Sequence, residues 1–342
     1  MERVTRTAAE LGDIACAILR CAGVPAADAE QTADVLLDAE RSGVESHGLM
    51  RLASYVDRLA GGLMEPHPEL QLSVQGAVGQ IDGGNGLGPV AACRAADLAA
   101  ELAQSYGVGV VAVRRSNHFG TAAYYSRRIA DQGCIGFAAS MAGPTVAPAG
   151  GMELLLGTNP FSIAFPAQSL TFCADMATSA AAKGKIRIYE QQGMPIPQGW
   201  ALDSSGRDTT DPKAALQGIL LPMAGHKGYA LAMVVDMLCG LLSGAALSGE
   251  SASVFQTDRP ANTGHFMAAV HIEHFLPQEE FSQRAQDWFD KLRSSKKRPG
   301  VTRIWIPGEP EAERRAQSEQ TVDILPETWR MLEEYRRKYG NQ

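Results

Sequence analysis

Residues 78–113, with the sequence VGQIDGGNGLGPVAACRAADLAAELAQSYGVGVVAV, carry the clearest indication of fold class in this chain. The run Val78–Asp82 and the β-branched run Val108–Val113 are typical of strands. Between them, a glycine-rich turn leads into an alanine-rich helix that extends to about Ser105. The order strand, turn, helix, strand predicts an α/β protein.

The glycine-rich turn does not match a Rossmann dinucleotide site. In such a site, a GxGxxG turn lets the backbone approach a pyrophosphate at a helix N-terminus. Here the glycines fall at positions 84, 86 and 88, and the second strand ends in Arg114–Arg115 without an acidic residue for a ribose. We therefore interpret residues 83–89 as a tight hairpin or as the entry turn of a helix.

An upstream segment, Glu40–Arg51 (ERSGVESHGLMR), combines a histidine with an arginine four residues later. Apolar residues recur at helical spacing from Leu49 onward, which predicts a helix with Ser46 near its N-cap. On that helix, His47 and Arg51 would share one face. An arginine fork binds a carboxylate, and a neighbouring histidine can exchange a proton near neutral pH. The pair suits a small 2-oxo or 2-hydroxy acid, although an ordinary surface helix could carry the same residues.

Further polar motifs lie at expected strand ends or helix starts. They are Ser116–Gly120, Gly157–Pro160, Asp175–Ser179 and Gly225–Gly228. Helix N–H groups beside a strand end favour an anionic or carbonyl ligand. The His–Lys pair in the last motif is typical of a phosphate site or of a plain helix cap. Asp175 is expected at the start of a helix, where it could simply be the N-cap.

The composition indicates a globular protein that does not bind nucleic acid. Its 342 residues are enough for two domains, or for one large domain with an appendage. The net charge of −7 argues against a nucleic-acid-binding role for the basic run Arg293–Arg298. The six cysteines lack CxxC spacing, which indicates reduced thiols and a cytoplasmic location.

No signal peptide, membrane span or metal site is expected. The most apolar run, Leu231–Leu247, contains Asp236 and Gly240 and is short for a bilayer, so we predict a buried helix. The pair His271 and His274 would suggest a metal hydrolase, but it lacks HExxH order. Because it falls in an expected strand, we predict that the two rings point to opposite faces.

Several other elements follow from local patterns. Helices are expected over Thr7–Cys21, Ala26–Ser42 and Pro326–Tyr339. A hairpin is expected around Gly199–Arg207, and a last strand over Val301–Ile306.

Together the motifs resemble the second type of malate/L-lactate dehydrogenase, a family distinct from the Rossmann-fold lactate and malate dehydrogenases. It also includes ureidoglycolate and sulfolactate dehydrogenases, a diketogulonate reductase and a reductase of cyclic imino acids. The blocks that carry the resemblance are Ser46–Gly48 with Arg51, Ser116–Gly120, Gly157–Pro160, Asp175–Ser179, Gly225–Tyr229 and Pro307–Glu309.

The resemblance implies an α/β (α+β) fold with a non-Rossmann nicotinamide-binding domain on a mostly antiparallel or mixed sheet. Residues 69–309 would form this domain and bind cofactor and substrate. Residues 1–68 and 310–342 would form a discontinuous helical domain beside it. The resemblance also implies a homodimer with active sites near the subunit interface.

By the same resemblance, His47 would donate the proton to the substrate and Ser46 would orient it. Arg51 would hold the substrate carboxylate, helped by Thr158, Lys183 and Gly184. The residues expected to line the cofactor are His118, Phe119, Gly120, Thr121, Asp175, Met176, Ala177, His226, Lys227, Gly308 and Glu309. In some family members the histidine that matches His118 is named as the proton acceptor. We favour His47 because of its spacing from Arg51.

The implied activity is hydride transfer between NAD or NADP, with NAD favoured, and a small 2-oxo or 2-hydroxy acid of the malate, lactate, sulfolactate or ureidoglycolate type. The alternative is NADPH-dependent reduction of cyclic imino acids such as piperideine-2-carboxylate or pyrroline-2-carboxylate. Two departures bear on the substrate: Ala149 stands where family members often carry an aromatic residue, and Phe161–Ser162 replaces a smaller, more aliphatic pair. The expected partners are a small carboxylic acid and a second copy of the chain, with no nucleic acid or membrane.

Overall fold

The computed structural model describes residues 3–339 and is built around a seven-stranded sheet. The strands lie in the order β2-β3-β4-β10-β5-β6-β7. Their bounds are β2 Gln71–Gln75, β3 Val78–Asp82, β4 Val108–Ser116, β5 Cys134–Ser140, β6 Phe161–Phe165, β7 Phe172–Met176 and β10 Thr263–His271. Strands β3 and β4 are parallel, and the other neighbouring pairs are antiparallel. The predicted α/β class with a mixed, mostly antiparallel sheet is confirmed.

Helix α4 (Gly88–Tyr106) connects the parallel strands β3 and β4. Pro89 lies in its first turn, where the missing N–H leaves no bond unmade, and Gly107 ends it with φ +80°. The alanine-rich helix approaches β4 so closely that a Cβ on Gly109 would lie 2.1 Å from the carbonyl oxygen of Ala99. Residues 83–87 are therefore the entry turn of a helix, which is one of the two interpretations of the glycine run.

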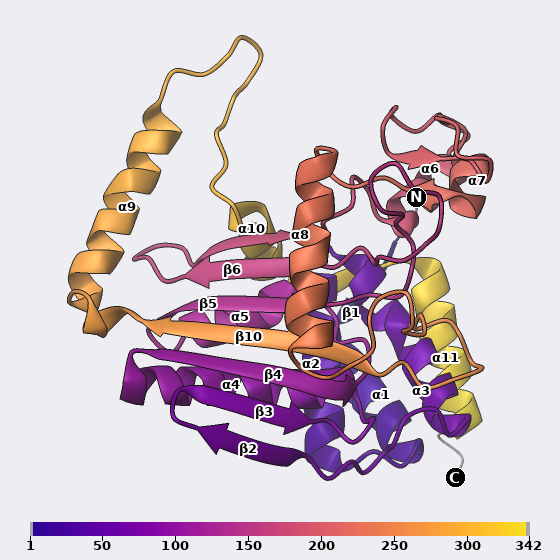
Figure 1. Cartoon of the computed structure of the whole chain (residues 1–342), viewed down its shortest axis with the longest axis horizontal. Coiled ribbons are helices and arrows are strands. Elements are labelled where there is room, and N and C mark those ends of the chain that lie inside the picture. Colours follow the sequence, from indigo (N-terminus) through magenta and orange to yellow (C-terminus); the bar gives the residue numbers. More distant parts are fainter. Residues whose placement is uncertain (1–2, 340–342) are drawn as a thin grey trace.

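Helices cover both faces of the sheet (Figure 1). On one face, α4 and α5 (Ala122–Ala130) share a core with Val111 and Met267 of the strands. On the other face, α8 (His226–Asp236) and the π-helix η3 (Met237–Leu241) pack against the sheet through Val235.

The prediction that the apolar run Leu231–Leu247 is a buried helix is wrong. Leu241 and Leu242 are 63% and 62% exposed, and Met237 is 54% exposed. These side chains are exposed to solvent because α8 and η3 lie on one face of the sheet. The two helices bury only the side that faces the sheet. Among residues 3–339, no helix has the length and apolarity needed to span a bilayer.

Elements from the first and last parts of the described chain lie together beside one end of the sheet (Figure 1). Strand β1 (Val4–Thr7) pairs antiparallel with β11 (Thr321–Ile324). Helix α11 (Pro326–Tyr339) packs on α1 (Ala8–Cys21). The same apolar core includes residues of α2 (Ala26–Arg41) and α3 (Leu52–Ala60). The expected helices at both chain ends are present.

The remaining elements lie at the edges of this body. Helices α6 (Lys183–Gln191) and α7 (Pro212–Gln217) pack with the short strands β8 (Ala201–Leu202) and β9 (Ile219–Leu220) around a small core of their own. Helix α9 (Gln278–Ser294) and the loop after it project from the body, and α10 (Glu309–Gln317) returns to it (Figure 1). All six cysteines lie in the described part of the chain, and none is disulfide-bonded.

Two predictions about strands and helix starts are wrong. Residues Val301–Ile306 are irregular instead of forming a strand. They form no ladder: the one bond to the edge strand β7, from Cys173 N–H to the carbonyl of Pro307, falls just past the segment, and the bonds at its two ends (Val301 N–H to Arg298, Glu309 N–H to Ile306) are local turns. Asp175 lies inside β7 and not at a helix start, because α6 begins later and has Ala182 as its N-cap.

The prediction about the faces of His271 and His274 is wrong, whereas the expected hairpin is present. Strand β10 ends at His271, and a 3₁₀ turn, η4 (Ile272–His274), follows. The turn brings the rings of His271 and His274 together, with centroids 5.4 Å apart, so they do not point to opposite faces. The hairpin expected around Gly199–Arg207 is present in short form: Leu202 and Asp208 make an antiparallel bridge, and the Asp203 N–H donates to the carbonyl of Arg207, while β8 also pairs with β9.

Candidate active site

Ser46, His47 and Arg51 lie in two consecutive 3₁₀ turns, η1 (Glu45–His47) and η2 (Leu49–Arg51), that precede α3. The expected α-helix with Ser46 at its N-cap is wrong, because Gly48 adopts φ −89° and ψ −149° and interrupts the helical path. The turns nevertheless bring the expected groups together. Arg51 Nε donates to the carbonyl oxygen of Ser46 at 2.5 Å, and Ser46 Oγ lies 2.9 Å from His47 Nδ1.

A buried carboxylate holds these turns in place. Glu40 Oε2 accepts a hydrogen bond of 3.0 Å from the N–H of Leu49, and Glu40 Oε1 has no partner among the described residues. A Cβ on Gly48 would lie 2.2 Å from Glu40 Oε2, so the glycine makes room for the carboxylate. Burial raises the pKa of Glu40 to about 7.

A second histidine from a distant strand end faces the first. The rings of His47 and His118 are stacked with centroids 5.4 Å apart. Tyr55 Oη lies 2.7 Å from His118 Nδ1, and the N–H of Gly120 donates to the same nitrogen at 3.3 Å. Two partners on Nδ1 leave His118 Nε2 as the free nitrogen of this ring.

Both histidines are neutral at pH 7. Burial, followed by the charge of Arg51, lowers the pKa of His47 to about 4. Burial also lowers the pKa of His118 well below its ordinary value, and the nearby His47 and Arg51 act in the same direction. Burial raises the pKa of Tyr55, so its hydroxyl keeps its proton. A neutral imidazole beside an arginine can accept a proton from a hydroxyl group.

Two of the expected substrate residues lie next to these turns. A Cβ on Gly184 would be 3.5 Å from Ser46 Cβ, so the start of α6 packs on the turn. Lys183 is the first residue of α6, and burial lowers the pKa of its ammonium group. The contacts of Thr158 run to another segment: its carbonyl accepts hydrogen bonds from the N–H and the hydroxyl of Thr178.

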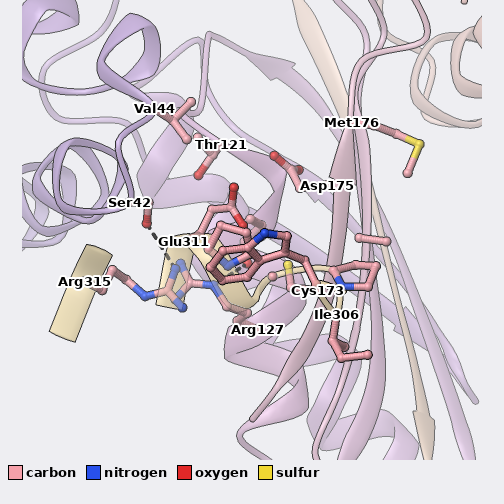
Figure 2. A pocket seen from close by; sticks show the side chains of 16 residues that line it. Ser42, Val44, Thr121, Arg127, Cys173, Asp175, Met176, Ile306, Glu311 and Arg315 are labelled. Carbon is pink, nitrogen blue, oxygen red and sulfur yellow. Dashed lines mark hydrogen bonds between the residues drawn. The ribbon is translucent and has the colours of Figure 1, made fainter. Parts of the chain in front are cut away.

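A cavity of about 470 Å³ brings together Thr121, Asp175, Met176 and Gly308 from the expected cofactor residues (Figure 2). Its other lining residues are Ser42, Val44, Ala123, Arg127, Cys173, Ala174, Trp305, Ile306, Pro307, Pro310, Glu311 and Arg315. Two of its walls come from the segments just after α2 and after β4, which also carry His47 and His118. The cavity and the histidine pair are thus connected through these two segments, although neither histidine lines the cavity.

The cavity has the features that phosphates and ribose hydroxyls need. Thr121 and Gly308 are the N-caps of α5 and α10, and neither N-cap makes a side-chain cap bond. The Ala123 N–H in the first turn of α5 has the Asp175 carboxylate as a partner, so a ligand at α5 would meet the other N–H groups of that turn. Arg315 bonds Ser42 Oγ at 3.1 Å without a carboxylate partner among the described residues, whereas the neighbouring Arg127 pairs with Asp38 (Figure 2). Desolvation raises the pKa of Asp175, whose carboxylate lies against the start of α5, to about 6. These residues fit a nicotinamide dinucleotide.

The remaining expected cofactor residues lie outside this cavity. Phe119 is buried between the rings of His265 and Tyr125. Its side chain therefore belongs to the packed interior next to His118 and is not open to a cofactor. The Glu309 carboxylate accepts from Arg293, from Arg303 and from the N–H of Ile306. It thereby closes the turn that precedes α10.

Three further expected residues are at the edge of the site. His226 and Lys227 are exposed at the start of α8, and Ala177 is half-buried. The next residue after Ala177, Thr178, connects them: its carbonyl accepts the N–H of Met223, just before α8.

Sequence reasoning missed Tyr55, Glu40, Arg127 and Arg315. Tyr55 follows Arg51 by four residues, so the helical spacing used for His47 and Arg51 could have found it. The two arginines come from segments far apart in the chain, and no local pattern connects them with the site. Residues 3–339 contain no group of three or more His, Cys, Asp or Glu side chains that could hold a metal ion.

Comparison with known proteins gives the same assignment as the motifs. The profile of the malate/L-lactate dehydrogenase family matches residues 7–333. The malate dehydrogenase of Pyrococcus abyssi is 40% identical over 309 residues, which cover 88% of this chain and 85% of that protein. The L-sulfolactate dehydrogenase of Methanocaldococcus jannaschii is 37% identical over 324 residues, which cover 94% of each.

Solved structures agree with the sequence comparisons. The structure of the sulfolactate dehydrogenase from Methanocaldococcus jannaschii superposes with a TM-score of 0.93 at 36% identity, covering 98% of both chains. A Δ1-piperideine-2-carboxylate reductase from Pseudomonas syringae superposes with a TM-score of 0.86 at 28% identity, covering 97% of this chain and 99% of that one. From its motifs, its fold and these relatives, the chain belongs to the malate/L-lactate dehydrogenase family.

Proposed function

We propose that this protein is an NAD(P)-dependent dehydrogenase that interconverts a small 2-hydroxy acid and its 2-oxo acid. The observation that carries the proposal is the pair of turns in which Arg51 and the neutral His47 are held by Ser46. An arginine fork can bind the carboxylate, and the imidazole beside it can handle the proton of the C2 oxygen.

The residues of the chain then have distinct tasks. Arg51 binds the substrate carboxylate, and Thr158, Lys183 and Gly184 complete the substrate side. With Nδ1–H donating to Ser46 Oγ, His47 Nε2 accepts the hydroxyl proton during oxidation and returns it during reduction. Because a bound carboxylate offsets the charge of Arg51, it favours protonation of His47 in the reductive direction. A bound nicotinamide would supply or accept the hydride.

We assign the proton to His47 and a supporting position to His118. His118 Nδ1 already has Tyr55 and the Gly120 N–H as partners, which fixes the ring against that of His47. The alternative, in which His118 Nε2 handles the proton, remains an outcome of the mutant comparison described in the Discussion.

We place the cofactor in the cavity lined by Thr121, Asp175, Met176 and Gly308, with Ala177, His226 and Lys227 farther along the same wall. NAD is the favoured form. Two carboxylates, Asp175 and Glu311, line this cavity, and a carboxylate favours ribose hydroxyls and repels a 2′-phosphate.

We further propose that the chain forms a homodimer. Apolar side chains of Met237, Leu241 and Leu242 are exposed along one helix, and a patch of this kind typically marks an interface. Helix α9 projects from the body and exposes Trp288, which gives a second copy an arm to pack against.

The experiment that tests the activity is oxidation of NADH and of NADPH with pyruvate, oxaloacetate, sulfopyruvate and two cyclic imino acids. We expect turnover with an open-chain 2-oxo acid and a preference for NADH. Turnover confined to the imino acids would instead assign the protein to the reductase branch represented by the piperideine-2-carboxylate reductase. A lack of turnover with every substrate, despite measurable binding of NADH, would refute the proposed activity.

A further inference from the structure

A loop just before β10 lies beside the helix that follows the active-site turns. Figure 1 shows this loop, residues 248–262, next to α3. Val254 packs on the apolar core that α1, α2 and α3 share. The following residue, Phe255, belongs to none of the apolar cores of the described residues and is 58% exposed. Its ring is therefore available to a neighbouring side chain.

A buried arginine fixes the loop to α3. Arg58 is 1% exposed, and its guanidinium donates to two carbonyl oxygens of the loop. Nη1 bonds that of Gln256, and Nη2 bonds that of Arg259 at 3.2 Å. Within the loop, the N–H of Ser253 donates to Gln256 Oε1 at 2.7 Å. Since an arginine is rarely buried without such partners, these bonds tie the loop to the protein interior without using the side chain of Phe255.

Arg51 lies on the same face of the helix as Arg58. The turn η2 continues into α3 because Arg51 already has helical backbone angles, with φ −77° and ψ −19°. Positions 51, 55 and 58 are four and three residues apart, so they share one face. The loop follows this face: Gln256 contacts Arg58, and Phe255 contacts Arg51. The Cζ atom of Arg51 lies 4.7 Å from the centroid of the Phe255 ring, within the range of a cation–π interaction.

Two contacts fix the orientation of the Arg51 guanidinium. Its Nε donates to the carbonyl oxygen of Ser46 at 2.5 Å, which sets the direction of the group within its plane. The ring of Phe255 covers one face of the group and restrains its tilt. Among residues 3–339, no ion pair includes Arg51. Its two Nη groups are therefore oriented, and a carboxylate can bind them in bidentate geometry.

We propose that Phe255 is a positioning residue for substrate binding, because its ring holds the Arg51 guanidinium in the orientation in which both Nη groups receive the substrate carboxylate. This inference rests on the proposed function, in which Arg51 binds that carboxylate, and it adds the residue that orients Arg51 in advance. Phe255 acts through Arg51 and not on the reacting atoms, so its contribution belongs to substrate affinity and not to the chemical step.

The test replaces Phe255 by leucine, which keeps an apolar side chain and removes the aromatic face. For Phe255→Leu, KM for 2-oxo acids should rise about 3- to 30-fold, the range for the loss of a cation–π interaction. Turnover, kcat, should stay within about twofold of wild type. Phe255→Trp keeps an aromatic face and should have a KM close to that of wild type. The control is Phe275→Leu, at a 72% exposed phenylalanine beyond the other end of β10, which should change neither constant.

A double-mutant cycle tests whether the ring acts through Arg51. Arg51→Gln removes the cation, so adding Phe255→Leu to it should lower kcat/KM no further. Effects of the two substitutions that multiply would show that the ring acts independently of Arg51 and would overturn the inference. A wild-type KM in Phe255→Leu would also overturn it, as would a Phe255→Trp protein that behaves like Phe255→Leu.

Binding of oxamate, a carboxylate that resembles pyruvate, separates this inference from the proposed function. Measured by the fluorescence of NADH-loaded protein, oxamate should bind Phe255→Leu about 3- to 30-fold more weakly than wild type. If this difference is found in a protein that reduces no 2-oxo acid, the proposed function fails and the inference stands. If Phe255→Leu and wild type reduce 2-oxo acids with the same KM, the function stands and the inference fails. Wild-type protein that neither binds oxamate nor reduces a 2-oxo acid would refute both.

Discussion

At the scale of single residues, the site depends on titratable groups that burial has moved away from their ordinary pKa values. His47 is neutral because its imidazolium form would be buried beside Arg51, which lowers its pKa to about 4. Glu40 has the opposite shift, to about 7, because its carboxylate is buried behind the same turns. The two groups therefore contribute opposite pH dependences to the stability of the fold.

The pKa of His47 can be tested directly. In the unfolded chain a histidine titrates near 6.5, so the folded state binds fewer protons than the unfolded state between about pH 4 and 6.5. Stability from this group is fully present above pH 6.5 and is lost as the pH falls. We expect the imidazole resonance of His47, assigned with His47→Gln, to show no titration between pH 8 and 5.5. A midpoint near 6.5 would contradict the burial argument.

The Glu40 carboxylate should destabilise the protein above neutral pH. Its folded pKa of about 7 lies above the ordinary 4.5, so the folded state binds more protons and its contribution to stability falls as the pH rises between these values. At 1.36 kcal/mol per pKa unit, this difference corresponds to about 3 kcal/mol. We expect Glu40→Gln to gain stability relative to wild type by about this amount between pH 5 and pH 8, measured by urea unfolding.

The control for that experiment is Glu69→Gln, which removes an exposed carboxylate. It should follow the wild-type pH dependence. A Glu40→Gln protein whose stability runs parallel to wild type at every pH would show that Glu40 is ionised normally in the fold.

The two histidines can be separated by their variants. His47→Ala should reduce turnover by about 10²- to 10⁴-fold, because it removes the group that exchanges the substrate proton. The affinity for NADH, measured by fluorescence, should be unchanged. Arg51→Lys should chiefly raise KM for 2-oxo acids, because a point charge replaces a fork. If His118→Ala damages turnover far more than His47→Ala, the proton belongs to His118.

At the scale of elements, close contact between helix and sheet matters as much as helical propensity. Helix α4 is rich in alanine, and its small side chains let it approach β4 at Gly109. The sequence predicted this helix and both flanking strands, because glycine, proline and β-branched residues mark their ends and interiors. It did not predict the irregular path of residues 301–306, because a strand needs a neighbouring strand that only the fold can supply.

The closeness of α4 and β4 leads to a stability prediction. Gly109→Ala places a Cβ 2.1 Å from the carbonyl of Ala99, so the helix and strand must separate at a cost of about 1–3 kcal/mol. The control is Gly12→Ala, at a half-buried glycine of α1, where a Cβ would lie 3.8 Å from Leu37 Cδ2, an ordinary contact. Because alanine favours a helix by up to about 1 kcal/mol over glycine, this control should be neutral or stabilising in thermal unfolding. Equal midpoints for the two variants would contradict the packing argument.

At the scale of the whole molecule, the apolar side of α8 and η3 is exposed in the single chain, and no other element of the described residues covers it. If the proposed homodimer uses this surface, Leu241→Asp should halve the molar mass measured by light scattering after size-exclusion chromatography, because a buried, unpaired charge is strongly unfavourable at an interface. The control is Tyr106→Asp, which should keep the wild-type mass. Tyr106 is the last residue of α4 and is 58% exposed. A dimer that persists in Leu241→Asp would place the interface elsewhere.

The sequence by itself determined the class of fold, the non-Rossmann character of the glycine turn and the family, and it predicted the chemistry that we propose for Ser46, His47 and Arg51. These follow from local signals: periodicity, glycine and proline positions, and short motifs whose residues are neighbours in the chain. The division of the chain at residues 68 and 309 stays a prediction.

Only the tertiary structure decided which distant residues meet. The hydrogen bond between Tyr55 and His118 joins positions 63 residues apart, and the contact of Arg315 with Ser42 joins positions 273 residues apart. The same applies to Glu40 behind the turns and to Gly184 beside them, whose positions depend on how α2 and α6 pack. Long-range packing is set by the shape and burial of whole elements, so no local pattern records it. The exposure of the apolar side of α8 has the same cause, since a run of apolar residues specifies a surface to be covered but not what covers it.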